Sequence, residues 1–215
     1  MPRKFHPRSR LSGVRDAKLI VIASEGAETE PTYFRELASL ASNTQVKVLP
    51  LTRNEADSGK SAPRYVVQML DDFRNSYPDQ ESNDELWAVV DLDNYDLTET
   101  ARLCYQKGYN LAVSNPCIEI WLLLHLKSLS EYSSEVLDEF RENPKINSRR
   151  NRLDMELLNI LGEYNKSNLK VEKHFYLRTE KAIERAKKLD DIKLRWPNDL
   201  GSRVYLIVEQ IINKK

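Results

Sequence analysis

Acidic residues follow two apolar segments of the chain at points where a strand would end. Glu25 comes directly after the apolar run at 18–24, and Asp91 and Asp93 follow the apolar run at 86–90. Because side chains alternate along an extended chain, both aspartates point to the same side. Three carboxylates at one place repel one another unless a cation neutralises them, and oxygen ligands of this kind suit Mg²⁺ or Mn²⁺ rather than zinc. The pattern predicts a divalent metal site.

A magnesium ion at such a site can bind a phosphate group and activate a water molecule, which is the chemistry of phosphoryl transfer. In this interpretation Asp91 and Asp93 hold the metal. Glu25 either completes the coordination or acts as general acid or base, and the residues leave both roles open. Pairs of aspartates spaced in this way also occur in plain surface turns, so it is the combination with Glu25 that favours a catalytic site.

A fourth carboxylate and an amide follow another apolar segment. Glu119 falls in the first turn of a strongly apolar helix predicted at 117–126. A carboxylate is costly there unless it has a partner, so we interpret Glu119 as a catalytic residue. Asn115 precedes Pro116, a pattern typical of a helix N-cap followed by proline in the first turn. The free N–H groups of that helix start and the Asn115 side chain could bind a phosphate.

Basic residues that could contact phosphate lie in three places. Arg149 and Arg150 belong to the densest internal basic cluster, and Lys166 follows a predicted helix from which it could reach the site as a cation for the transition state. Lys60 is part of a polar loop. A solvated, charged segment is the alternative interpretation for each of them. The Gly-Lys-Ser that includes Lys60 lacks the first glycine of a Walker A loop, where Asn54 stands, so the chain is not expected to be an ATPase.

Strand and helix patterns alternate over the first 130 residues and would position these side chains. Strands are expected at 18–24, 45–51, 86–90 and 109–113, and helices from about Pro31 and at 64–73, 96–107 and 117–126. This alternation predicts an α/β fold with a doubly wound, mainly parallel sheet. Ligands of such sheets bind beyond the carboxyl ends of the strands, and the candidate acidic residues all fall on that edge.

The patterns after residue 130 are helical or irregular, with helices expected at 136–141, 153–164, 180–189 and 203–212. We therefore expect an α/β core at 18–130 and a mostly helical C-terminal extension at 131–215 that packs on it. Residues 1–17 are expected to form a basic, partly disordered arm.

Composition indicates a globular protein of a reducing compartment. The 215 residues include 33 basic and 33 acidic side chains, and 40% of the residues are hydrophobic, as expected for one domain. The spacing of the two cysteines fits neither a zinc motif nor a disulfide framework, which favours the cytoplasm. The chain has no signal-like start, and its apolar runs are far shorter than the roughly 20 residues that span a bilayer, so no membrane association is expected.

Several stretches resemble the RloB family: LIVIASEGAETEPTYF at 19–34, WAVVDLDNYD at 87–96, LAVSNPCIEIWLLLHL at 111–126 and, more weakly, NDLGSRVYLIVEQII at 198–212. The placement of Glu25 and of the Asp91–Asp93 pair is also similar to the Toprim arrangement of primases, topoisomerases and OLD-type nucleases. Members of the RloB family often have arginine inside this pair. Leu92 stands there in this chain, which removes one phosphate contact.

The resemblance implies a Toprim-like fold and a Mg²⁺-dependent nuclease that acts on RNA, with tRNA among the candidates, or on DNA. It also implies a role in antiviral defence of bacteria by abortive infection, under the control of a partner ATPase of the AAA/ABC class, and it leaves room for an oligomer. One alternative is a catalytically silent Toprim-like module that binds an ATPase or nucleic acid. The least favoured alternative is a phosphotransferase similar to haloacid dehalogenases. The motif of those enzymes normally lies on the first strand, and it normally continues to Thr or Val at the position where this chain has Tyr95.

Overall fold

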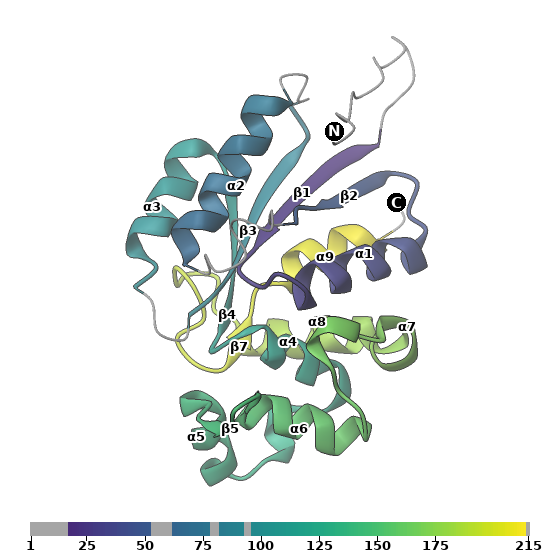
Figure 1. Ribbon diagram of the computed structural model, residues 1–215, viewed down its shortest axis with the longest axis vertical. Coiled ribbons are helices and arrows are strands. Elements are labelled where there is room, and N and C mark those ends of the chain that lie inside the picture. Colours follow the sequence, from purple (N-terminus) through teal and green to yellow (C-terminus); the bar gives the residue numbers. More distant parts are fainter. Residues whose placement is uncertain (1–16, 53–61, 78–81, 93–95, 214–215) are drawn as a thin grey trace.

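The computed structural model describes residues 17–52, 62–77, 82–92 and 96–213 (Figure 1). At its centre is a five-stranded sheet in the order β2–β1–β3–β4–β7. Its strands are β1 (Lys18–Ser24), β2 (Val46–Pro50), β3 (Glu85–Asp91), β4 (Asn110–Asn115) and β7 (Gly201–Ser202). The pairs among the first four strands are parallel, and β7 runs antiparallel to β4. The predicted mainly parallel sheet is confirmed.

Helices cover both faces of this sheet, as Figure 1 shows, and this explains why its central strands are apolar throughout. One face is covered by α2 (Pro63–Ser76) and α3 (Thr98–Lys107), and the other by α1 (Thr29–Ala41), α4 (Ile118–Leu126) and α9 (Tyr205–Ile212). In β1, Val21 packs in the cluster formed with α2 and α3, whereas its neighbour Ile20 packs with α1, α4 and α9. The doubly wound arrangement is therefore confirmed.

The chain from 127 to 200 is helical but also contains a short hairpin that the sequence analysis did not predict. Its helices are α5 (Ser134–Glu142), α6 (Arg152–Leu161), α7 (Val171–His174) and α8 (Thr179–Leu189), with short 3₁₀ helices η2 (Leu129–Glu131), η3 (Lys166–Asn168) and η4 (Tyr176–Arg178). The hairpin consists of β5 (Lys145–Asn147) and β6 (Arg150–Asn151). Such short strands show no detectable alternation, and the same holds for β7. The predicted helix at 153–164 ends earlier, at Leu161, because Gly162 adopts a left-handed conformation (φ 71°).

The expected α/β core and C-terminal extension share one hydrophobic cluster. Trp121 of α4 is fully buried there together with Phe140 of α5, Phe175 after α7 and Val208 of α9. The segments after residue 130 thus complete the core on the α4 side of the sheet. Residues 1–16 of the expected basic arm lie outside the described residues. None of the described helices combines the length and apolar character that a membrane span requires.

His125 of α4 is buried in this cluster as the neutral imidazole. Its Nδ1 lies 2.9 Å from the carbonyl oxygen of Trp121, and its Nε2 lies 3.1 Å from the hydroxyl oxygen of Tyr33. A carbonyl oxygen can only accept, so Nδ1 carries the proton and Nε2 accepts from Tyr33. Burial lowers the pKa of His125 to about 3. His125 is therefore a hydrogen-bonded core residue.

The buried histidine predicts a loss of stability in acid. The unfolded chain protonates His125 below pH 6.5, whereas the folded chain does so only near pH 3, so stability is complete above 6.5 and falls as the pH drops. Between these values we expect His125 to cost about 1.4 kcal/mol of unfolding free energy per pH unit. His125→Gln should lack this part of the pH dependence. Urea unfolding of both proteins at pH 7 and pH 5 measures the effect, and parallel losses would contradict it.

Candidate functional site

The carboxyl ends of β1 and β3 bring two of the predicted carboxylates to one edge of the sheet. The backbone N–H of Glu25 donates to the carbonyl oxygen of Val89 at 3.2 Å, so the pairing of the two strands continues to Glu25. Asp91 is the last residue of β3 and lies opposite Ser114 of β4 in the register. Glu25 and Asp91 therefore leave the sheet on neighbouring strands.

These two residues suit a hard divalent cation. Both are partly buried, and both offer only carboxylate oxygens, the ligands that Mg²⁺ and Mn²⁺ prefer. Asp93, the third predicted ligand, lies outside the described residues. Within the described ranges no group of three or more His, Cys, Asp or Glu side chains is arranged to hold a metal. The described structure thus provides two of the three carboxylates that the sequence analysis assigned to the metal.

Glu119 lies in the first turn of α4, as predicted, and belongs to a second polar group that we call the Glu119 cluster: Glu119, Asp154, Tyr164 and Lys166. The Lys166 ammonium lies 2.8 Å from Oε1 of Glu119 and 3.0 Å from Oδ1 of Asp154. The Tyr164 hydroxyl donates to the same Glu119 oxygen at 3.2 Å. Burial would raise the pKa of Glu119, but the Lys166 charge together with hydrogen bonds from Lys166 and Cys117 outweighs burial and keeps the pKa below its usual value. Glu119 is therefore a buried, charged and fully partnered carboxylate.

Glu30 is a buried carboxylate that the sequence analysis missed. It is only 3% exposed, and its Oε1 accepts a hydrogen bond from the N–H of Gly26 at 2.9 Å. Burial raises the pKa of Glu30, and the negative charge of Glu119 raises it further. A side chain at position 26 would collide with this carboxylate, which explains the glycine after Glu25. In the sequence, Glu30 looked like an ordinary acidic residue in the first turn of a helix.

Two sets of contacts connect the carboxyl edge with the Glu119 cluster. The thiol of Cys117 has its pKa raised by burial and by the negative charges of both Glu119 and Asp91, so both carboxylates lie near this thiol. The Thr29 hydroxyl, in the loop and helix start after β1, donates to the carbonyl oxygen of Lys166 at 3.4 Å. The candidate site therefore extends from the strand ends to η3.

A hollow of about 610 Å³ opens beside the Glu119 cluster. Arg149, Arg150 and Lys166, which the sequence analysis selected as phosphate contacts, all line it. Lys170 lines it too, although no sequence pattern had singled that residue out. Lys60, the remaining basic candidate, lies outside the described residues. Basic residues from two separate places in the sequence, 149–150 and 166, thus share one concave surface.

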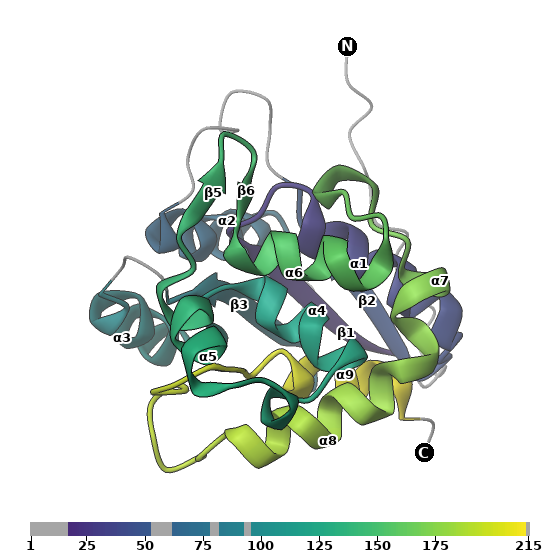
Figure 2. The same ribbon diagram turned by 90° about the horizontal axis from the view of Figure 1, so that it is seen from below.

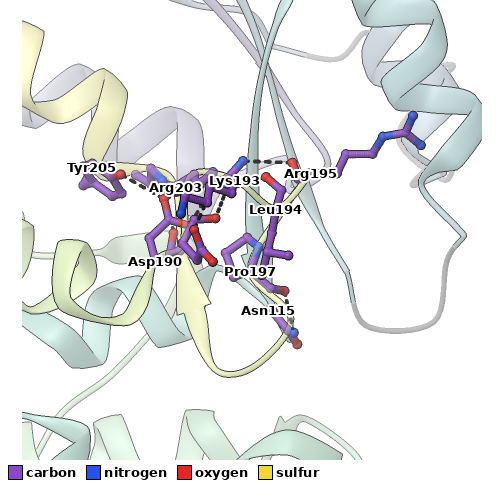
Figure 3. Close-up of polar contacts among 11 residues, drawn as sticks. Asn115, Asp190, Lys193, Leu194, Arg195, Pro197, Arg203 and Tyr205 are labelled. Carbon is purple, nitrogen blue, oxygen red and sulfur yellow. Dashed lines mark hydrogen bonds and ion pairs between the residues drawn. The ribbon is translucent and has the colours of Figure 1, made fainter.

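The prediction that Asn115 caps a helix is wrong. Asn115 is the last residue of β4, where it pairs with Gly201 of β7, and α4 begins only at Ile118 after Cys117. This pairing holds Asn115 in the sheet, so the helix cannot start at Pro116, and the bond between Asn115 and Pro116 is cis. The Asn115 amide donates to the carbonyl oxygen of Pro197 at 3.0 Å (Figure 3).

The loop that carries Pro197 is fixed by Arg203, which follows β7. As Figure 3 shows, the guanidinium binds the Asp190 carboxylate, at 3.0 and 3.1 Å, and also the backbone carbonyls of Asp191, Leu194 and Arg195, at 2.9 to 3.0 Å. Asp190 is almost completely buried, so this charge pair is shielded from water. Arg203 thereby holds the loop against the end of β4 and positions the acceptor of Asn115.

The fold and the site together define an α/β protein with carboxylates at the carboxyl edge of a mainly parallel sheet and a basic hollow beside them. A family model described as RloB-like protein matches residues 20–211. The chain therefore belongs to the RloB-like family. A search of the curated proteins and a search of the solved structures each found no match.

Proposed function

We propose that this protein is a Mg²⁺-dependent (or Mn²⁺-dependent) phosphodiesterase of the Toprim-like kind that cleaves RNA, tRNA included, or DNA. The observation that supports this most is the position of Glu25 and Asp91 on neighbouring strand ends, together with a hollow lined by arginine and lysine beside the Glu119 cluster. Carboxylates that can hold a metal and cations that can bind phosphate are two features on which metal-dependent phosphodiester cleavage relies.

The described residues suggest distinct roles. Glu25 and Asp91, with Asp93, would hold the metal, which when bound supplies Lewis-acid chemistry to a phosphate and its attacking water. Lys166 would face the negative charge that develops on the phosphate in the transition state. Glu119 would hold the Lys166 ammonium in place rather than act as a base, because the Glu119 carboxylate is already ion-paired. Arg149 and Arg150 would contact the phosphate backbone.

The proposed setting is antiviral defence in the bacterial cytoplasm, by abortive infection and with a partner ATPase of the AAA/ABC class. Family membership supports this setting, and the charge balance is compatible with it. With 33 basic and 33 acidic residues, the chain lacks the excess positive charge of proteins that bind nucleic acid strongly by themselves. A partner that delivers or exposes the substrate would compensate for this.

A second candidate is a catalytically silent module that binds an ATPase or nucleic acid. It is favoured by one observation, namely that Glu119, which the sequence analysis interpreted as catalytic, is already held in an ion pair with Lys166. In this case Glu25 and Asp91 would serve recognition or structure only.

Mapping of nucleic acid ends in infected cells separates the two candidates. The wild type, Glu25→Ala and Asp91→Ala/Asp93→Ala would each be expressed with an ATPase encoded beside the gene. Asp72→Ala removes an exposed carboxylate from α2 and is the matched control. New RNA or DNA ends after phage challenge with the wild type and the control, but not with the site variants, would support the nuclease and name its substrate. If the nucleic acid ends stay unchanged and the site variants still defend the cells, the binding module is the remaining candidate.

A further inference from the structure

The basic hollow is walled by the β5–β6 hairpin, α6 and the segment from Glu163 to Phe175. Figures 1 and 2 both place α6 beyond the carboxyl edge of the sheet, on the side where β1 and β3 end. Lys166 lines the hollow and at the same time contacts Glu119, so it marks the border between the hollow and the candidate active site. A ligand in the hollow would therefore lie next to the proposed reaction centre.

The acidic residues of the hollow are neutralised within the protein. Asp154 is paired with Lys166 at 3.0 Å, and Glu163 is paired with Lys170 at 2.6 Å and with Lys173. After these pairs are formed, the excess positive charge of the hollow comes from its two arginines, Arg149 and Arg150.

Arg149 and Arg150 carry that excess charge. Among the residues that the structure describes, neither guanidinium has a carboxylate at ion-pair distance. Arg150 is held in the wall of the hollow by a hydrogen bond to the carbonyl oxygen of Tyr164 at 3.0 Å, which leaves its charge uncompensated. Two such guanidiniums in the lining of one hollow can bind the oxygens of a phosphate group.

The remaining lining and the size of the hollow suit a single nucleotide. The partly buried Leu158 and Leu161 give it an apolar wall against which a base can pack. Its volume of about 610 Å³ lies within the range of roughly 300–1,000 Å³ that is usual for pockets of small organic ligands. A nucleic acid duplex, with two paired backbones, is too wide to enter it.

We propose that the hollow binds one nucleotide of a single-stranded nucleic acid, with its phosphodiester on Arg149 and Arg150, while the adjoining part of the strand reaches Glu25 and Asp91. This inference rests on the proposed function, and it names the substrate as single-stranded and assigns a subsite outside the metal-binding edge.

Binding of labelled single-stranded RNA and DNA oligonucleotides to the full chain, measured by fluorescence anisotropy in EDTA, tests the hollow without any cleavage. Arg149→Ala/Arg150→Ala should weaken binding by about 10-fold or more, because hydrogen bonds to charged groups are lost. The slope of log Kd against log salt should fall by about 0.7 for each phosphate contact removed. Arg149→Glu leaves the Arg150 hydrogen bond in place and should weaken binding as well.

Lys181→Ala/Lys188→Ala is the matched control, because it removes the same charge from exposed positions of α8 outside the hollow. Its affinity should stay within about two-fold of the wild type, as expected for residues without a phosphate contact. Equal losses in the hollow variants and in this control would overturn the proposal, since binding would then depend on overall charge alone. Wild-type affinity in both arginine variants would also overturn it.

Competition distinguishes a strand from a free nucleotide. If the hollow takes part of a strand, a mononucleotide or inorganic phosphate should displace the labelled oligonucleotide only at far higher concentration than an unlabelled oligonucleotide does. Displacement by mononucleotide and oligonucleotide at equal concentration would overturn the strand assignment.

A parallel cleavage assay in Mg²⁺ separates failure of the hollow from failure of the proposed function. If the wild type binds the oligonucleotide through Arg149 and Arg150 but does not cleave it, the proposed nucleotide site in the hollow is supported and the proposed nuclease function is refuted. If cleavage requires Asp91 but the arginine variants bind and cleave like the wild type, only the proposed nucleotide site in the hollow is refuted.

Discussion

Asp91→Asn should lower the rate of Mg²⁺-dependent nucleic acid cleavage by at least about 100-fold, because even residues that only support a metal ligand typically contribute 10–100-fold. Asparagine has nearly the shape of aspartate but no charge, so the substitution removes the metal's electrostatic partner and leaves the packing at the end of β3 intact. Asp91 pairs with Ser114 through the backbone register, which the substitution does not touch. The folded structure should persist.

The measurement is cleavage of an end-labelled oligonucleotide over a Mg²⁺ titration, with the partner ATPase added if the chain is inactive by itself. Asp72→Asn, on the exposed side of α2, is the control and should cleave like the wild type. Thermal melting would verify that Asp91→Asn is folded. A folded Asp91→Asn protein that cleaves at the wild-type rate would refute the assignment of Asp91 to a metal, and with it the proposed mechanism.

Lys166→Met should lower the free energy of unfolding by about 2–3 kcal/mol. Only 5% and 4% of the Glu119 and Asp154 side chains are exposed, and Lys166 is the cation between them. Removal of one partner of a buried ion pair typically costs about 3–5 kcal/mol, and we reduce this value because 44% of the Lys166 side chain is exposed to water. Urea unfolding at neutral pH measures the loss.

Two further variants isolate the cause of this loss. Lys170→Met removes an exposed lysine whose partner Glu163 is also exposed, so it should cost less than about 1 kcal/mol. Lys166→Met/Glu119→Gln should regain part of the lost stability, because glutamine removes a buried charge yet still accepts from Tyr164. If the double variant were no more stable than Lys166→Met, the ion pair would not be the reason for the loss.

The pH dependence of Lys166→Met follows from the same ion pair. In the wild type, the pKa of Glu119 lies below its usual 4.5, so the stability that this carboxylate contributes is present above that value and is lost in acid. In the variant, burial without the ammonium raises the pKa of Glu119 above 4.5, and this carboxylate then reduces stability as the pH rises. The difference in unfolding free energy between the two proteins should be largest near pH 8 and should shrink toward pH 5.

The sequence by itself determined the four parallel strands of the sheet and the position of their carboxyl edge. The run KLIVIAS at 18–24 is apolar at successive positions, which is typical of a parallel strand with helices on both faces, and β1 has the predicted bounds. Since parallel strands all end on the same edge, Glu25 and Asp91 had to lie on that edge, and the pairing of β1 with β3 then makes them neighbours. Local patterns were sufficient here because periodicity and strand ends are local properties.

Only the tertiary structure decided which partners the buried charges have. Glu119 clearly required a partner, but Lys166 reaches it only after the chain has passed through α5, the hairpin and α6. Asp154 also caps α6, where its carboxylate accepts a hydrogen bond from the N–H of Asn151. Ion pairs between distant segments depend on the path of the whole chain and leave no periodic signal in the sequence.

The same reason explains the end of β4 and the hollow. The two residues of β7 are too few to show a strand pattern, yet their pairing keeps Asn115 in the sheet and delays the start of α4. In the sequence, Arg149 and Arg150 formed one basic candidate and Lys166 another, and only the folded chain brings all three to the lining of one hollow. Hydrophobic periodicity thus fixed the layers, whereas the contacts between distant loops fixed the chemistry that surrounds the edge.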